Sequence, residues 1–286
     1  MRKDSLSANI TAGIVLYNPD ITRLRQNIKA IVSQVQDLVI VDNGSDNICE
    51  IDALVKIYPN ISLILLEKNL GIAYAQNRIC QFAEEKGYDW AITLDQDSIS
   101  PIGLVEEYEK LIIDPSVGMV SPRIIDRNFG EIYIKENVSE VEEINECIAS
   151  ASAIRITAWK EVGGFYEPLF IDKVDFDICQ SLREAGYIIL RTNRVNLLHE
   201  VGHSCIVHYA GKDWQLLNHS PLRYYYIIRN AFIVGRRHGG LARYILRDVR
   251  VFYQVTRFED NKLEKAKKML LGFIHGLIGK EGKYGK

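Results

Sequence analysis

The chain has 286 residues, a formal net charge of −2 and a hydrophobic content of 47%. That length suits one large domain or two modest ones, and that apolar content excludes a disordered or fibrous protein. Residues 1–9 are polar, and no apolar run approaches the roughly 20 residues that a membrane span needs, so neither a signal peptide nor a spanning helix is predicted. Five cysteines without a metal-binding or redox spacing predict reduced thiols and a cytoplasmic protein.

Charge is unevenly spread along the chain. Residues 236–286 contain thirteen Lys or Arg and five Asp or Glu, a balance of +8 that leaves −10 for residues 1–235. This asymmetry predicts that the C-terminal part meets an anionic partner. No nucleic-acid partner is expected.

The first hundred residues alternate between strand and helix patterns. Short apolar runs rich in β-formers predict strands, and apolar residues at spacings of three and four predict helices that cover a sheet. The predicted strands are 10–17, 38–41, 61–66 and 90–94. The predicted helices are 21–32, 48–58 and 72–83, the first with Asn18 as its cap and Pro19 in its first turn. This alternation predicts repeated right-handed βαβ units and therefore an α/β fold with a mostly parallel sheet.

Polar residues follow each of the four strands. They are Tyr17 with Asn18, Asp42 with Asn43, Asn69 with Gly71, and Asp95 with Asp97. Any one of these is more simply explained as a turn or cap residue. The carboxyl ends of parallel strands, however, gather at one edge of a sheet, where open α/β sheets bind their ligands. Four successive polar strand ends therefore predict a binding crevice.

Asp95 and Asp97 stand one residue apart at the end of the fourth strand. Two crowded carboxylates repel each other unless a cation joins them. Oxygen ligands suit Mg²⁺ or Mn²⁺, which usually complete their coordination shell with substrate phosphates. The motif alone is weak evidence, because Asp175 and Asp177 repeat it in this chain.

The second half of the chain is less regular. Strands are predicted at 117–125 and 187–198, with an acidic, turn-rich segment at 126–146 near the crevice, and residues 221–256 are predicted to be helical. A second acidic cluster, 170–177, leads into a helix that ends at Gly186. Asp175 and Asp177 would lie in its first turn, where the helix dipole favours negative charge, and for Asp177 this structural role is the preferred interpretation.

Residues 199–203 read His-Glu-Val-Gly-His and match the H-E-x-x-H pattern of zinc proteases. That pattern requires both histidines on one face of a helix. Here Gly202 falls inside it and β-like sequence flanks it on both sides, so a zinc site is disfavoured.

The segment 259–286 combines apolar residues with lysines. Such a segment can lie in a membrane interface, where each basic residue contributes roughly 1 kcal/mol near anionic lipid. It can equally be a packed terminal helix or a homodimer contact. The sequence leaves these readings open, and with them a peripheral position at the inner face of the plasma membrane.

Taken together, these motifs resemble the inverting glycosyltransferase family 2, which has the GT-A fold, and within it the bacterial rhamnosyltransferases. The matching residues are 17–20, 41–45, Asn69, Gly71, Asn77, 94–98, 163–165, 170–172, Val174, Asp175, Asp177, Gly186, Tyr187, His199 and Gly202. They cover about residues 10–235 in family order, and they are specific as a set although each alone is not. The resemblance implies a GT-A domain followed by a helical C-terminal extension.

By that resemblance, Asp42 receives the pyrimidine of a nucleotide-sugar and Tyr17 packs beside the base. Asp97 holds the Mg²⁺ or Mn²⁺ ion, Asp95 contacts the ribose or the metal shell, and His199 lies near the metal or diphosphate. The further residues implied to bind the nucleotide-sugar are Asn18, Asn43, Asn69, Gly71, Asn77 and Arg229.

The catalytic base of the family is the Asp of a Glu-Asp pair before a helix, which corresponds to Asp175. Here Val174 replaces the Glu, as in the rhamnosyltransferase variant with its upstream Asp172. The resemblance therefore implies Asp175 as the base, with Asp172 as the other catalytic residue. An Asp near its ordinary pKa is ionised at neutral pH and can accept the proton of the acceptor hydroxyl.

The implied activity is transfer of L-rhamnose from dTDP-L-rhamnose to a lipid-linked or cell-surface polysaccharide acceptor. The alternatives are another hexose or deoxyhexose from a UDP- or GDP-sugar, and a non-catalytic nucleotide-sugar binder or scaffold. The expected layout is a nucleotide-sugar-binding half at 1–100, an acceptor-binding and catalytic half of the same domain at 101–215, and a basic helical extension at 216–286.

Two other enzyme classes fit less well. Residues 95–99 nearly match the Asp-x-Asp-x-Thr/Val motif of a phosphatase class that forms an aspartyl-phosphate, but those enzymes carry it on their first strand, and here it follows the fourth. A nucleotidyltransferase is disfavoured because residues 17–20 lack a glycine-rich phosphate cradle.

Overall fold

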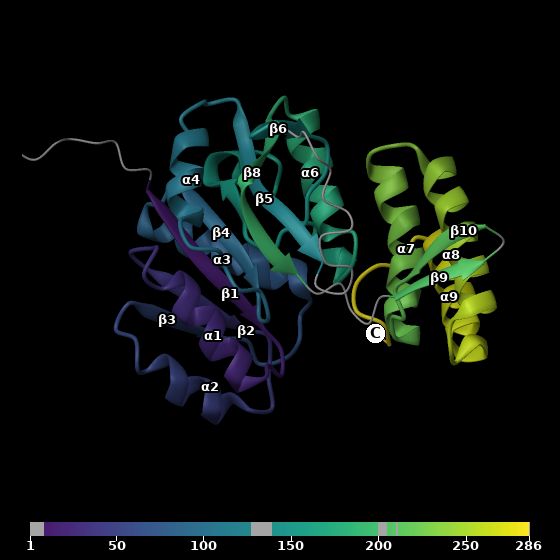
Figure 1. Cartoon of the computed structure of the whole chain (residues 1–286). Helices are drawn as coiled ribbons and strands as arrows, with labels where there is room; N and C mark the ends of the chain where they lie inside the picture. The colour runs from purple at the N-terminus through teal and green to yellow at the C-terminus, as the bar shows by residue number, and fades with distance from the viewer. Residues whose placement is uncertain (1–8, 127–138, 200–204, 210, 286) are drawn as a thin grey trace, which may run out of the picture.

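The computed structural model describes residues 9–126, 139–199, 205–209 and 211–285. An eight-stranded sheet carries helices on both faces, and a two-stranded hairpin with further helices stands beside it (Figure 1). No helix within these ranges is both long and apolar enough to cross a bilayer.

The large sheet is mixed but mostly parallel. Its strands are β1 (Ile10–Leu16), β2 (Leu38–Asp42), β3 (Ile61–Leu65), β4 (Trp90–Asp95), β5 (Val117–Asp126), β6 (Val141–Ile144), β7 (Ser152–Arg155) and β8 (Ile188–His199), in the order β3-β2-β1-β4-β7-β5-β8-β6. Strands β1 to β4 are parallel, as are β5 and β8, while β7 and β6 run antiparallel to their neighbours. Because β2 and β4 flank β1 on opposite sides, the strand order reverses there. Open α/β sheets bind their ligands at this position, and the region at the carboxyl ends of these strands is here called the crevice.

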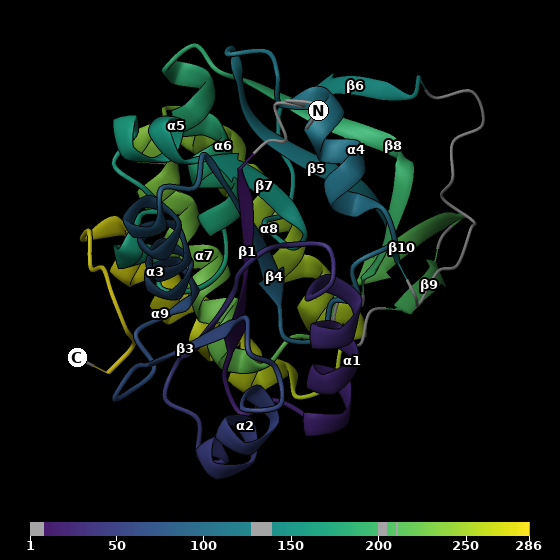
Figure 2. The ribbon, with the colours of Figure 1, turned by 90° about the vertical axis from the view of Figure 1, so that its left-hand side faces the viewer.

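Helices cover both faces of this sheet (Figure 2). One face packs against α1 (Ile21–Ile31), α2 (Ile48–Val55) and α4 (Leu104–Leu111), and the other against α3 (Ile72–Lys86), α5 (Ile156–Glu161) and α6 (Val174–Glu184). Successive residues of a strand point to opposite faces, so Ile14 joins the first core and Val15 the second. Both faces are apolar because both are covered, which is why these strands are continuous apolar runs.

The alternation predicted for the first hundred residues is confirmed, and most strand and helix ends agree within one to three residues. The predicted cap is wrong, however. Asp20 caps α1, because its side chain accepts the Arg23 N–H at 2.8 Å, and Asn18 is drawn into a neighbouring loop. The helix α4 was not predicted, because the sequence after Pro101 carries weaker signals.

Three helices form a separate unit, shown at the right of Figure 1. They are α7 (Pro221–Arg237), α8 (Leu241–Phe258) and α9 (Lys262–Leu277), so the helical region predicted at 221–256 is confirmed but interrupted by Gly239 and Gly240. The unit has its own core, which includes Tyr224, Phe232 and Met269. The hairpin of β9 (Cys205–Tyr209) and β10 (Lys212–Leu216) packs on α8, where the rings of Trp214 and Tyr253 lie 5.6 Å apart.

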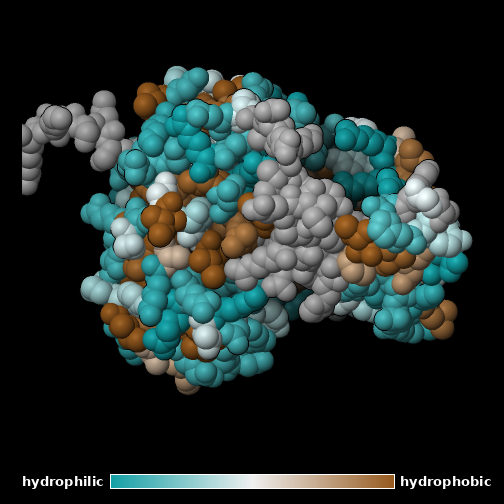
Figure 3. Space-filling model, viewed as in Figure 1, coloured by the Kyte–Doolittle hydropathy of each residue, from teal (hydrophilic) through white to brown (hydrophobic). Residues whose placement is uncertain are grey.

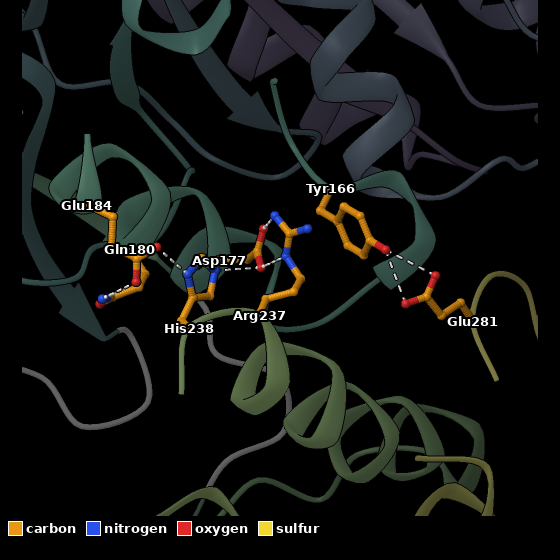
Figure 4. Close-up of polar contacts among 7 residues, drawn as sticks. All are labelled: Tyr166, Asp177, Gln180, Glu184, Arg237, His238 and Glu281. Carbon is orange, nitrogen blue, oxygen red and sulfur yellow. Dashed lines mark hydrogen bonds and ion pairs between the residues drawn. The ribbon is translucent and has the colours of Figure 1, made fainter. Parts of the chain in front are cut away.

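An ionic cluster joins the helical unit to α6 (Figure 4). The Asp177 carboxylate, which is fully buried, accepts hydrogen bonds from Arg237 Nε at 2.8 Å and His238 Nε2 at 3.0 Å. His238 Nδ1 lies 2.9 Å from Glu184, and hydrogen bonding to Asp177 raises the pKa of His238. The structural role expected for Asp177 in the first turn of α6 is thereby confirmed.

Candidate active site

The carboxyl end of β2 holds a buried carboxylate with one oxygen free. Asp42 is 2% exposed, and its Oδ2 accepts the backbone N–H groups of Gly44 at 3.2 Å and Ser45 at 3.0 Å. Its Oδ1 has no hydrogen-bond partner among the described residues. A buried carboxylate oxygen without a partner is costly, so this atom is placed to accept a hydrogen bond from a ligand.

The loop after β1 lies beside this carboxylate. Tyr17 is 48% exposed, which leaves its ring available for stacking. Asn18 bridges the two loops, since its N–H donates to Ser45 Oγ at 2.8 Å and its Oδ1 accepts the Asp46 N–H at 2.7 Å. Tyr17 and Asp42 therefore flank the same end of the sheet, as the strand pattern predicted.

Two amide side chains fix the position of the β4 loop. The Asn27 amide, from α1, donates to the Asp95 carbonyl at 2.7 Å. Gln96 Oε1 accepts the Tyr17 N–H at 2.9 Å and so ties the β4 loop to the β1 loop. Asp95 and Asp97 themselves are partly exposed at the strand end. Gln96 and Asn27 were not predicted as site residues, because neither has a signal of its own in the sequence.

Asp175, in the first turn of α6, lies near the Asp95 carboxylate at the end of β4. Burial raises the pKa of Asp175 to about 7, with a further contribution from the nearby Asp95 carboxylate, while a hydrogen bond from the Ala149 N–H opposes the shift. Asp95 and Asp175, which are 80 residues apart in the sequence, therefore lie near each other. A cation between them would relieve this repulsion.

The loop that precedes α6 is held in a strained conformation. Phe170, Asp172 and Lys173 have φ values of 66°, 65° and 60°, and each such residue costs roughly 1–3 kcal/mol. Asn230 of α7 holds the loop, because its Nδ2 donates to the carbonyls of Leu169, Ile171 and Asp172 at 3.0, 2.7 and 2.9 Å. The strain is maintained by contacts from another element, as expected at a functional loop.

Arg223, also on α7, pairs with the second predicted catalytic carboxylate. Its Nε donates to Asp172 Oδ1 at 3.1 Å, and the Asp172 side chain is 10% exposed. Burial raises the pKa of Asp172, whereas Arg223 opposes that shift. Asp172 is therefore partly neutralised by a cation, and Asp175 is the carboxylate better placed to accept a proton.

Arg229, which was predicted to bind the nucleotide-sugar, points into the protein. Arg229 is fully buried, and its guanidinium donates to the Leu169 carbonyl at 2.8 Å, to Asn230 Oδ1 and to the carbonyl of Gly282. The spacing of six residues accounts for this difference, because it places Arg223 and Arg229 on different sides of α7, and Arg223 is the one that pairs with Asp172. The Ser220–Pro221 start of the helix, which places Arg223 in the first turn, was the available signal.

Asn77, which was also predicted to bind the nucleotide-sugar, is buried as well. Asn77 is 6% exposed, its Nδ2 donates to the Phe165 carbonyl and Glu167 Oε1, and its Oδ1 accepts from Trp159 and the Phe165 N–H. All four hydrogen-bonding positions of the amide are therefore used within the protein.

Asn43, Asn69 and Gly71 hold neighbouring loops together. Asn43 is 3% exposed and donates to the Gly71 carbonyl at 3.2 Å, while Asn69 Oδ1 accepts the Gly71 N–H at 3.0 Å. Gly71 has φ +99°, and a Cβ there would lie 2.5 Å from the Phe170 carbonyl oxygen. This close approach holds the loop that precedes α6 against the start of α3, and only glycine permits it.

The donor set of the crevice fits a hard divalent cation. The described residues contain no group of three or more His, Cys, Asp or Glu side chains that could hold a metal by themselves. Mg²⁺ is commonly held by one or two carboxylates together with substrate phosphates, which is what Asp95 and Asp97 offer. His199 ends strand β8, and its side chain lies outside the described residues, as do residues 200–204, but a strand at His199 is inconsistent with the zinc-protease helix.

Comparison with known proteins agrees with this geometry. Residues 11–162 match the family model Glycosyl transferase family 2. The chain is 30% identical over 296 residues to dTDP-rhamnosyl transferase RfbF of Shigella flexneri, covering 97% of this chain and 98% of that protein. It is 24% identical over 230 residues to the N-acetylglucosaminyl-diphospho-decaprenol L-rhamnosyltransferase of Mycobacterium tuberculosis, covering 65% of this chain and 73% of that one.

Among solved structures, the fold is similar to mannosyltransferase PcManGT from Pyrobaculum calidifontis, determined with GDP-Man and Mn²⁺. The TM-score is 0.58 at 14% identity, covering 94% of this chain and 75% of that chain. This likeness confirms the GT-A fold expected from the sequence. Because the family model spans residues 11–162 and a relative is similar along nearly the whole chain, the chain belongs to glycosyl transferase family 2.

Proposed function

We propose that this glycosyltransferase moves L-rhamnose from dTDP-L-rhamnose to a lipid-linked or cell-surface polysaccharide acceptor, with inversion at the anomeric carbon. The observation that carries the proposal is that Asp42 and Asp95 end the strands on the two sides of β1 and that Asp175 lies near Asp95. The similarity to RfbF over 97% of the chain supports rhamnose as the sugar. A hexose or deoxyhexose from a UDP- or GDP-sugar is the second candidate, because a buried carboxylate also accepts an N–H from uracil or guanine.

Donor binding follows from the two neighbouring loops. The free Oδ1 of Asp42 would accept the N3–H of the pyrimidine, and the exposed ring of Tyr17 would lie against the base. Asp95 and Asp97 would hold Mg²⁺ or Mn²⁺, which when bound stabilises the charge that develops on the departing diphosphate.

Proton transfer falls to Asp175. As the acceptor oxygen attacks the anomeric carbon from the face opposite the diphosphate, the hydroxyl proton passes to the Asp175 carboxylate. The bond between the anomeric carbon and the diphosphate oxygen breaks, so the configuration inverts. With its pKa raised to about 7, Asp175 is a stronger base than an ordinary Asp and is still partly ionised at neutral pH.

The working layout has the donor half in residues 1–100, the acceptor half in 101–215, and a helical extension in 216–286 that contributes Arg223 to the catalytic loop. The enzyme would act in the cytoplasm on an acceptor carried at the inner membrane face. A homodimer through the helical extension is the alternative that the sedimentation velocity measurement below tests.

Transfer assays on a panel of dTDP-, UDP- and GDP-sugars, each with Mg²⁺ or Mn²⁺, test the proposal. We expect dTDP-L-rhamnose to be the preferred donor, and Asp97→Ala and Asp175→Ala each to reduce kcat at least about a hundredfold. Asp46→Ala, on an exposed loop residue, is the matched control. Full activity of Asp97→Ala would refute the metal assignment, and full activity of Asp175→Ala would refute the base. Binding of dTDP without transfer to any acceptor would favour a non-catalytic binder.

A further inference from the structure

The outward face of α8 and α9 is apolar, although it is not part of the protein core. Leu246, Val249, Leu263, Leu270, Leu277 and Ile278 are between 52% and 73% exposed. The inward residues of the same helices, among them Val255 and Met269, pack in the core of the helical unit. We call these six outward residues, with Phe252 and Phe273 beside them, the α8–α9 face.

The α8–α9 face is continuous across both helices. A cavity of about 450 Å³ lies between them, lined by Val249 and Phe252 from one helix and by Leu263, Leu270 and Phe273 from the other. In the view of Figure 3, the helical unit at the right carries separate patches of apolar, brown surface among hydrophilic side chains. Contiguous apolar patches of this kind usually mark an interaction surface.

A row of arginines borders the α8–α9 face. Arg243, Arg247, Arg250 and Arg257 follow spacings of four, three and seven, so they lie along one side of α8, and all four are exposed. Three of them also stack on aromatic rings of α6 or of the hairpin, namely Arg247 on Phe176, Arg250 on Trp214 and Arg257 on Tyr209. The only acid on this helix, Asp248, is 7% exposed. The exposed surface of α8 therefore consists of an apolar stripe beside a basic stripe, without any exposed negative charge.

We propose that the α8–α9 face binds the surface of an anionic membrane, with its apolar side chains in the boundary between headgroups and acyl chains. Charge complementarity selects this partner, because the arginine row would meet lipid phosphates as the apolar stripe enters the bilayer. In a two-fold dimer the same patch would meet itself, which would bring the arginine rows of two copies together with no exposed acid on α8 to pair with them.

This position would place the catalytic loop near the membrane. The helical unit that carries the α8–α9 face also supplies Arg223, which pairs with Asp172, and Asn230, which holds the loop of residues 169–172. An acceptor held in the bilayer would then reach the crevice without leaving the membrane. Membrane binding does not depend on the identity of the sugar, so it stands or fails independently of the proposed reaction.

Vesicle flotation of the full chain tests the proposal. Vesicles of phosphatidylcholine alone are compared with vesicles that also contain phosphatidylglycerol, in the absence of any nucleotide-sugar. Each basic residue near an anionic surface contributes about fivefold, so Arg243→Gln with Arg247→Gln is expected to weaken binding to anionic vesicles about thirtyfold. Leu246→Gln with Leu270→Gln is expected to weaken it at least about tenfold through lost apolar burial.

The matched control is Arg25→Gln with Lys29→Gln, an exposed pair at the same spacing on α1 of the sheet domain, which should leave binding within about twofold of wild type. Thermal unfolding of every variant shows whether the fold is kept. Three results would overturn the proposal: no binding of the wild type to anionic vesicles, equal losses in the control pair, or a dimer in sedimentation velocity that Leu246→Gln with Leu270→Gln dissociates.

Discussion

The replacement Asp42→Asn separates ligand binding from fold stability at the nucleotide site. In the wild type, Asp42 Oδ2 accepts the N–H groups of Gly44 and Ser45 at 3.2 and 3.0 Å. The substitution keeps the size of the side chain, and the new amide oxygen can still accept both N–H groups. The position of Oδ1, however, becomes an NH₂ group that faces the donor N3–H of the pyrimidine. The nucleotide therefore loses a charge-assisted hydrogen bond and gains a repulsive donor–donor contact.

The lost hydrogen bond to a charged group amounts to about 1.5–3 kcal/mol, which corresponds to a dTDP affinity roughly 10- to 150-fold weaker. The free energy of unfolding of the variant should be equal to that of the wild type or higher. A buried carboxylate oxygen without a partner costs about 1–3 kcal/mol in the free enzyme, and a neutral amide costs less. Isothermal titration calorimetry with dTDP and thermal unfolding measure the two effects. Asp46→Asn makes the same change of charge on an exposed residue of the same loop and serves as the control. An affinity within twofold of wild type would refute the assignment of Asp42 to the base.

Two further predictions concern the helical unit. Asn230→Asp keeps an oxygen for the Arg229 guanidinium but replaces the Nδ2 donor with an oxygen that repels the carbonyls of the loop. The new ion pair with Arg229 offsets part of this loss, so the free energy of unfolding measured in urea should fall by about 1–3 kcal/mol, and an unchanged free energy would contradict the holding role. Burial raises the pKa of Asp248 to about 7, so the folded state keeps a proton that the unfolded chain loses from about pH 4 upward. The free energy of unfolding should therefore decrease by up to about 4 kcal/mol as pH rises from about 4 to about 7. Asp248→Asn should abolish this pH dependence in urea unfolding. An unchanged pH dependence in the variant would show that another group titrates.

Much of the α/β domain was predictable because its signals are local. Strands β1, β2 and β4 are buried apolar runs, and β3, at the edge of the sheet, is apolar but only partly buried. Each helix between them repeats apolar residues every three or four positions. Connections between parallel strands are right-handed, so the gathering of Asp42 and Asp95 at one edge follows from chain order alone. That edge also carries Tyr17, as predicted.

Contacts between residues far apart in the sequence determine features that the local sequence pattern does not predict. Asn18 is a good cap residue by type, but Ser45 and Asp46 of another loop engage it, and Asp20 caps the helix instead. Arg223 and Arg229 look alike in the sequence, and only the packing of α7 against the loop of residues 169–172 turns one to the crevice and buries the other.

The sequence by itself determined the alternating α/β core and the strand-end carboxylates, because periodicity and strand direction are properties of the local chain. Only the tertiary structure decided that Asp175 faces Asp95 across 80 residues and that the free oxygen of Asp42 is Oδ1. It also showed that the apolar stripes of α8 and α9 point outward together. Hydrophobic periodicity shows that a helix has an apolar side, but the choice of what covers that side depends on every other element that competes for the core.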